Sequence, residues 1–120
     1  MALRLRKSKV SAPPGACPLS ECMAMLRGAW APNVIWYLSG GPRRFSELRR
    51  DIPRISARVL SARLHDLVER GVLVRIETDT SPPSVEYQLT DLGLELMPAI
   101  EAIAHVGAKL KERNRFRQRA

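Results

Sequence analysis

Residues 45–90 read FSELRRDIPRISARVLSARLHDLVERGVLVRIETDTSPPSVEYQLT, and they decide how this chain folds. From residue 56 to residue 70 the apolar side chains recur at helical spacing, and they are Val59, Leu60, Leu64, Leu67 and Val68. A helix with this pattern buries one face and turns the other toward solvent. The residues on that outer face are Arg58, Ser61, Ala62 and His65. Ser56 is predicted to cap the start of the helix, and Gly71 to end it.

A shorter helix precedes this one, and a hairpin follows it. Ser46 is predicted to be the N-cap of a helix over residues 47–51. Residues 72–78 and 85–89 alternate or run apolar, so they are predicted to be strands, and a polar, proline-bearing tip separates them. Helix, turn, helix and hairpin, in this order, predict a winged helix-turn-helix, whose second helix fits the major groove of DNA. The stretch therefore indicates binding to duplex DNA.

Further helices are predicted on both sides of this stretch. They cover residues 19–26 and 32–38, and a last helix begins after its N-cap Thr90. Pro98 is expected to kink that last helix or divide it in two. The predicted fold class is α+β, mainly α: a winged helix-turn-helix with N- and C-terminal dimerisation helices.

The length of 120 residues predicts one folded domain. Residues 1–16 are basic and end in a Pro- and Gly-containing segment, so they are expected to form a flexible arm. Residues 17–108 are expected to form the winged helix-turn-helix domain. Residues 109–120 are expected to be a basic C-terminal tail.

The net charge of +8 is distributed unevenly. Residues 1–9 carry +4, and residues 109–120 carry +5. Residues 27–63 hold eight arginines against two acids, a net charge of +6, whereas residues 64–108 have a net charge of −6. Positive charge therefore coincides with the helix-turn-helix and with both ends, where it attracts phosphate.

Other classes of function have little support in the sequence. Two cysteines, Cys17 and Cys22, and two isolated histidines make neither a disulfide framework nor a metal site. No carboxylates are paired for acid–base chemistry, so neither an enzyme nor a cofactor is expected. We expect no membrane segment and no secretory signal, and hence a cytoplasmic protein.

The candidate DNA contacts lie on the second helix of the motif, around its first helix and in the hairpin. Arg58 has the planar fork that binds guanine, although a phosphate contact or a solvated charge is the alternative. The arginines around the first helix are predicted to contact phosphates, and Ser56 sits at a helix N-terminus that favours phosphate. The full set is Arg43, Arg44, Ser46, Arg49, Arg50, Ser56, Ala57, Arg58, Ser61, Ala62, His65 and Ser84.

The first and last helices carry more apolar surface than a small winged-helix core needs. We expect this surface to pack around a two-fold axis in a homodimer, with the reading helices one DNA turn apart, roughly 34 Å. The alternative is a last helix that folds back on its own core. The expected interface residues are Leu19, Met23, Leu26, Ile100, Ile103, Val106 and Leu110.

A series of motifs runs through residues 17–107 in a fixed order. They are Cys17-Pro18, then GAWAP at 28–32, RFSEL at 44–48, IPRIS at 52–56, PSVEYQLT at 83–90, and Gly93. In order and spacing the chain resembles the HxlR-type winged helix-turn-helix regulators of bacteria, which are related to the MarR type. The resemblance implies a homodimeric transcription factor on pseudo-palindromic operator DNA. Ala29 and Ala31 depart from residues common in that family, outside the reading helix.

The resemblance also points to Cys17, because in several family members the cysteine at this position resembles a thiol switch. Such a switch needs an exposed thiolate in a positive environment. The basic arm and a helix start favour it, whereas Glu21 opposes it, so a structural cysteine is the alternative. A small-molecule or oxidant effector is therefore a candidate partner, and Cys22 is expected to be a core residue.

Two other functions are compatible with a winged helix. A protein-interaction module would use the shape without DNA, but it would not need the +6 stretch at residues 27–63. A non-specific DNA-binding protein would depend mainly on the basic ends. The leading prediction is a sequence-specific, double-stranded DNA-binding regulator that acts as a homodimer.

Overall fold

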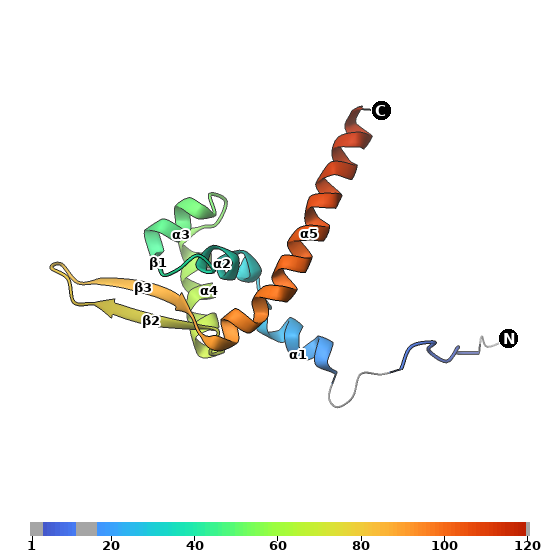
Figure 1. Cartoon of the computed structure of the whole chain (residues 1–120), viewed down its shortest axis with the longest axis horizontal. Coiled ribbons are helices and arrows are strands. Elements are labelled where there is room, and N and C mark those ends of the chain that lie inside the picture. Colours follow the sequence, from blue (N-terminus) through green and yellow to red (C-terminus); the bar gives the residue numbers. More distant parts are fainter. Residues whose placement is uncertain (1–3, 12–16, 120) are drawn as a thin grey trace.

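The computed structural model describes residues 4–11 and 17–119 of the chain. Among these residues a bundle of helices carries a projecting hairpin (Figure 1). The elements in chain order are α1 (Pro18–Met25), α2 (Ala31–Leu38), β1 (Arg43–Arg44), α3 (Phe45–Asp51), α4 (Ala57–Glu69), β2 (Leu73–Thr78), β3 (Ser84–Leu89) and α5 (Asp91–Arg119). This arrangement confirms the predicted α+β, mainly α, winged helix-turn-helix.

The helix-turn-helix consists of α3 and α4. Ser56 caps α4 as predicted, because its Oγ accepts a hydrogen bond of 3.1 Å from the Val59 N–H. The prediction for α3 was wrong by two residues: the N-cap is Arg44, whose N–H donates to Glu47 Oε1 at 2.8 Å. Ser46 therefore lies inside the first turn of α3. The glutamate side chain, rather than a serine, satisfies the exposed N–H at this helix start.

The wing is an antiparallel hairpin of β2 and β3, in which Leu73 pairs with Leu89 and Thr78 with Ser84. Its strands agree with the predicted ones to within one residue. A third strand, β1, pairs with β3 through Arg43 and Tyr87, so the sheet order is β1-β3-β2. β1 was not predicted from the sequence, because two arginines have no strand periodicity.

The core lies where α2 meets α3, α4 and the base of the wing. The largest fully buried side chains are Ile35, Leu38, Leu48, Leu60, Leu64, Leu67, Val34 and Val72. Leu26 and Ile100, which the sequence analysis grouped with the dimer interface, are only 7% and 3% exposed. Both belong to the core of the chain itself, where they pack with the other buried apolar residues.

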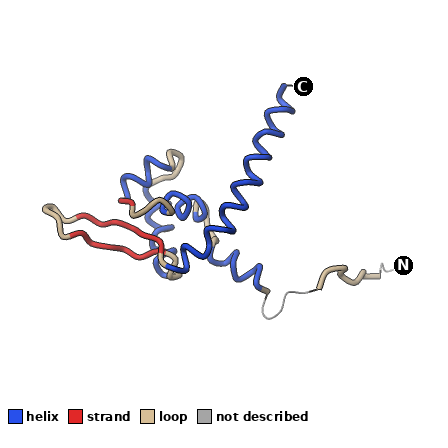
Figure 2. Tube along the Cα trace, in the orientation of Figure 1, coloured by secondary structure: helices blue, strands red, loops and turns tan. Residues whose placement is uncertain are grey.

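α5 leaves the body of the molecule as one long helix (Figure 2). It contains Pro98 without being divided there, and residues 109–119, expected to form a tail, continue the helix. At the other end, residues 4–11 form no helix or strand. Residues 1–3 and 12–16, the remainder of the predicted flexible arm, lie outside the described residues.

The corner between the wing and α5 is closed around the backbone of Val72. Thr90 donates its N–H to Val72 O at 3.0 Å, and its Oγ1 accepts from the Gly93 N–H at 3.2 Å. Gly93 lies so close to this corner that an added Cβ would be 2.5 Å from Val72 O and 3.0 Å from Leu89 Cδ2. Only glycine fits here without moving backbone.

Replacing Gly93 by alanine is therefore expected to lower the free energy of unfolding by about 1–3 kcal/mol, because the new methyl group forces the corner apart. Gly40→Ala is the matched control, since a Cβ there meets no atom within 4 Å. Its effect is expected to stay within about 0.5 kcal/mol. Urea unfolding at one protein concentration measures both. Equal effects of the two substitutions would contradict the close approach at Gly93.

Candidate DNA-binding surface

The outer face of α4 is set by burial of its inner face. Leu60, Leu64 and Leu67 are buried in the core. Since a helix repeats every 3.6 residues, the residues between them point outward. The exposed residues are Ala57, Arg58, Ser61, Ala62 and His65, as the sequence pattern predicted. Arg58 lies in the first turn of α4, the part of a reading helix that comes nearest to base edges.

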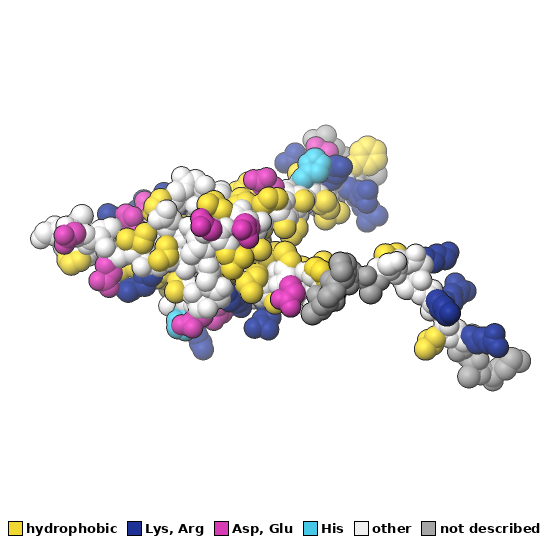
Figure 3. Space-filling view, turned by 60° about the horizontal axis from the view of Figure 1, so that its bottom comes forward, with side chains coloured by type: hydrophobic (Ala, Val, Ile, Leu, Met, Phe, Trp, Pro, Cys, Tyr) yellow, Lys and Arg dark blue, Asp and Glu magenta, His cyan; other side chains and the backbone are white. Residues whose placement is uncertain are grey.

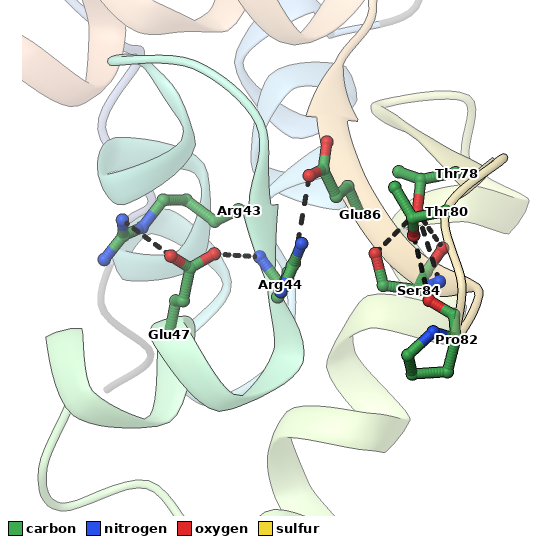
Figure 4. A network of polar contacts seen from close by, with 8 residues as sticks. All are labelled: Arg43, Arg44, Glu47, Thr78, Thr80, Pro82, Ser84 and Glu86. Carbon is green, nitrogen blue, oxygen red and sulfur yellow. Dashed lines mark hydrogen bonds and ion pairs between the residues drawn. The ribbon is translucent and has the colours of Figure 1, made fainter.

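Several arginines surround this face. Arg49 and Arg50 on α3 are exposed and have no hydrogen bond or ion pair with any described residue. Arg54, in the turn directly before α4, is exposed as well. Arg54 was not among the DNA contacts predicted from the sequence, although an arginine two residues before a helix cap is well placed to meet phosphate. The side chain of Arg44 makes only a long contact with the described residues, 3.9 Å from its Nε to Glu86 Oε1 (Figure 4).

Arg43 differs from its neighbours because its guanidinium is engaged within the protein. Its Nε and Nη2 donate to the two carboxylate oxygens of Asp51 at 3.0 and 2.8 Å, and Nη1 lies 3.4 Å from Glu47 Oε2. The hydrogen bonds to Asp51 raise the pKa of Arg43 above its ordinary value. This fork ties β1 to the end of α3, so Arg43 offers little to a phosphate.

The tip of the wing is also held by internal hydrogen bonds (Figure 4). Thr78 Oγ1 lies 2.6 Å from Ser84 Oγ and accepts from the Ser84 N–H at 3.1 Å, while Thr80 donates to Pro82 O at 2.9 Å. The Ser84 hydroxyl, a predicted DNA contact, therefore already has a partner. Residues 79–83 beside it are all exposed, and the carboxylate of Asp79 disfavours insertion into a groove lined by phosphates.

Comparison with known proteins agrees with this geometry. Residues 25–115 match the HxlR-like helix-turn-helix family. The chain belongs to that family. The HTH-type transcriptional regulator YdeP of Bacillus subtilis, itself uncharacterized, is 35% identical over 97 residues, which are 81% of this chain and 76% of YdeP.

Solved structures of transcription regulators are also similar to this chain. The redox regulator HypR in its oxidized form has a TM-score of 0.73 and 31% identity, over 78% of this chain and 96% of HypR. A transcriptional regulator of the MarR family from Enterococcus faecalis V583 has a TM-score of 0.72 and 27% identity, over 89% of this chain and 97% of its own. This HxlR-like protein is thus a DNA-binding transcription regulator, and its relatives are regulators rather than enzymes.

A second surface of the HxlR-like chain is apolar. Leu19 and Met23 on α1, and Ile103, Val106 and Leu110 on α5, are all more than half exposed. Two hollows border this surface: one of about 390 Å³ between α2 and α5 beside Trp36 and Tyr37, and one of about 410 Å³ along α5 from Ala102 to Leu110. Figure 3 shows hydrophobic side chains where α1 and α5 leave the body, and Lys and Arg toward the free end of α5.

The two cysteines have different surroundings. Cys17 is the exposed N-cap of α1, and interactions with the backbone N–H and then the hydroxyl of Ser20 lower the pKa of its thiol. Cys22 is half-buried and packs against the core, as expected.

Among the described residues no three His, Cys, Asp or Glu side chains gather into a metal site. Within the same part of the chain, every helix falls short of the length and apolarity that crossing a membrane demands.

The lowered pKa predicts how fast Cys17 reacts with an alkylating agent. More thiolate is present at neutral pH than for an ordinary thiol, so the midpoint of its pH–rate profile is expected below the usual value. Ser20→Ala removes the hydroxyl but keeps the backbone N–H, and should move the midpoint partly back toward higher pH. Mass spectrometry of iodoacetamide-treated protein measures this for Cys17 alone. With Ser61→Ala as the remote control, an unchanged profile in Ser20→Ala would refute the role of the Ser20 hydroxyl.

Proposed function

We propose that this HxlR-like regulator is a homodimer that binds a pseudo-palindromic operator with sequence specificity. The observation that carries the proposal is the exposed face of α4, bordered by arginines that have no strong internal partner. In the proposed complex α4 lies in the major groove, and the arginines of α3 and the turn lie over the flanking phosphates.

Base reading is proposed for the first two turns of α4. Arg58 donates two hydrogen bonds to guanine O6 and N7, which its planar fork matches. Ser61 and His65 follow on the same face, while Ala57 and Ala62 are small enough to contact thymine methyl groups. Sequence preference then depends on few side chains, with Arg58 the strongest of them.

Phosphate contacts are proposed for Arg44, Arg49, Arg50 and Arg54, together with Ser46 and the N-terminus of α4 at Ser56. A helix N-terminus with free N–H groups attracts an anion. Arg43 and Ser84 are not included, because their polar groups already bond within the protein. The phosphate contacts position α4 but carry no sequence information of their own.

The dimer is proposed to form through α1 and α5. Three exposed apolar residues of α5, Ile103, Val106 and Leu110, recur three and four residues apart, the spacing of a helix–helix seam. Charge along α5 changes sign: Asp91, Glu95 and Glu101 occupy its first half, and five basic residues follow from Lys109 to Arg117 against Glu112. An antiparallel arrangement of two α5 helices therefore places opposite charges together, whereas a parallel one opposes like charges.

An oxidant response is a second proposal, and it rests on Cys17. The thiol is exposed, its pKa is lowered, and it stands at the start of α1 beside the proposed dimer surface. HypR, a structural relative, is a redox regulator.

As a DNA-binding regulator, the protein is proposed to act in the cytoplasm, where bacterial DNA lies.

Selection from randomised duplex DNA at physiological salt tests the main proposal. The wild-type protein is expected to enrich an inverted repeat with half-sites about one turn, roughly 34 Å, apart. Arg58→Glu is expected to abolish this enrichment, because it removes the guanine contact and adds a charge that phosphates repel. Uniform binding that collapses with salt would refute the operator proposal and favour non-specific binding. Absence of binding would favour a protein-interaction module.

Ile103→Asp is expected to convert the dimer into monomers, because each α5 then places an unpaired carboxylate in the apolar seam. Leu94→Asp is the matched control: Leu94 is 54% exposed, as is Ile103, but it lies on the opposite side of α5. Sedimentation velocity over a range of concentrations distinguishes monomer from dimer. A dimer that survives Ile103→Asp but not Leu94→Asp would place the interface elsewhere.

A further inference from the structure

Arg63 in α4 and Arg70, the residue that caps its C-terminal end, do not lie on the proposed DNA-binding face. Arg63 and Arg70 are seven residues apart, two helical turns, so they share one side of α4, which differs from the side of Arg58, Ser61 and His65. The Arg63 side chain is only 15% exposed. Their charge thus adds little to the surface that meets phosphate, and their contacts lead to another part of the molecule.

Both guanidinium groups bind backbone carbonyl oxygens at the end of α1 and in the turn after it. Arg63 Nε donates to Ala29 O at 2.8 Å. Arg70 Nη1 donates to Arg27 O at 2.8 Å and to Met25 O at 3.3 Å. The last carbonyls of a helix have no partner within the helix and carry the negative end of its dipole, so a cation binds there favourably.

Further contacts fix the geometry at Arg63. Its Nη1 donates to Asp66 Oδ2 at 2.8 Å, one turn along α4, which holds the guanidinium in place. Gly28 lies directly beneath it with φ +105°, and a Cβ at Gly28 would collide with the Arg63 guanidinium. The turn after α1 is therefore shaped to admit the arginine.

Apolar packing at α1 is weak by comparison. Pro18–Met25 contains no fully buried residue, and only Cys22 and Met25 pack against the core from it. Apolar contacts are non-directional, whereas hydrogen bonds to carbonyls prescribe direction and distance. Beside Leu26, which follows α1 and is buried in the core, the hydrogen bonds of Arg63 and Arg70 are the directional contacts that join the end of α1 to α4.

We propose that Arg63 and Arg70 are positioning residues that transmit the geometry of the dimer to the reading helix. This inference rests on the proposed function, in which α1 belongs to the dimer interface. If α1 is fixed at the two-fold axis and α4 is fixed to α1, the distance and twist between the two α4 helices are fixed too. The arginines then set which half-site spacing the dimer accepts, without touching DNA.

The test compares spacing preference in the wild-type protein and in Arg63→Met/Arg70→Met. The selected operator is varied by one or two base pairs between its half-sites, and the dissociation constant is measured on each duplex. The wild-type protein is expected to lose about tenfold in affinity, or more, when the spacing changes by one base pair. The double variant is expected to lose at most about threefold, because its reading helices adapt to the altered spacing.

Arg75→Met is the matched control. It removes one positive charge from the wing, where Arg75 contacts only the exposed Glu77 of the same strand. It is expected to weaken binding to all duplexes alike and to leave the spacing preference unchanged. Gly28→Ala disturbs the contact of Arg63 with the turn after α1, and it should relax the spacing preference as the arginine variants do.

The outcomes separate this inference from the proposed function. A wild-type protein that selects no inverted repeat contradicts the proposed function itself. A sharp spacing preference that the wild-type protein shows and the double variant retains overturns the inference. If the double variant also loses thermal stability, the arginines are purely stabilising. Where the double variant does not fold, Arg63→Lys and Arg70→Lys take its place, since lysine keeps the charge but not the geometry of the fork.

A second readout does not depend on DNA. A nitroxide label is attached to Ser61→Cys in a Cys17→Ser/Cys22→Ser background. Pulsed electron paramagnetic resonance then gives the distribution of distances between the two α4 helices of the dimer. The distribution is expected to be narrow with both arginines present and broader in the variants. Equal widths would overturn the proposal regardless of how the variants bind operator.

Discussion

Burial of one face of α4 is the constraint from which the rest of the molecule follows. Leu60, Leu64 and Leu67 pack against α2 and α3, and full burial of such a side chain stabilises the fold by about 1.5–3 kcal/mol. Because a helix has a fixed period, this burial also determines which residues face outward. The reading surface is thus a consequence of the core, and a change in the inner face of α4 would rotate or loosen the outer one.

The arginines of this half of the chain have two distinct tasks. Some remain exposed around α4 and provide the positive potential that attracts DNA. Others bind within the protein: Arg43 ties β1 to α3, and Arg63 and Arg70 tie α4 to the end of α1. Net charge alone therefore overstates the surface available to phosphate. It also gives no indication of the hydrogen bonds by which Arg63 and Arg70 are proposed to align the helix-turn-helix with the dimer axis.

The features that the sequence predicted well are those with a local physical cause. The period of α4, its cap at Ser56, the glycine stop at Gly71 and the polar wing tip follow from residues close together in the chain. The N-cap of α3 was missed because a glutamate side chain replaced the expected serine. β1, the burial of Leu26 and Ile100, and the internal bonds of Arg43 and Ser84 all depend on partners distant in the sequence or across a turn. A periodic pattern carries no information about such partners.

The central claim is that α4 reads guanine in the major groove from each half of a two-fold dimer. Methylation interference on a bound operator tests it most directly, because methylation at guanine N7 blocks the contact proposed for Arg58. The account predicts two interfering guanine clusters, related by a two-fold axis and about one helical turn, roughly 10 base pairs, apart. Binding that methylation of no guanine disturbs would contradict the claim.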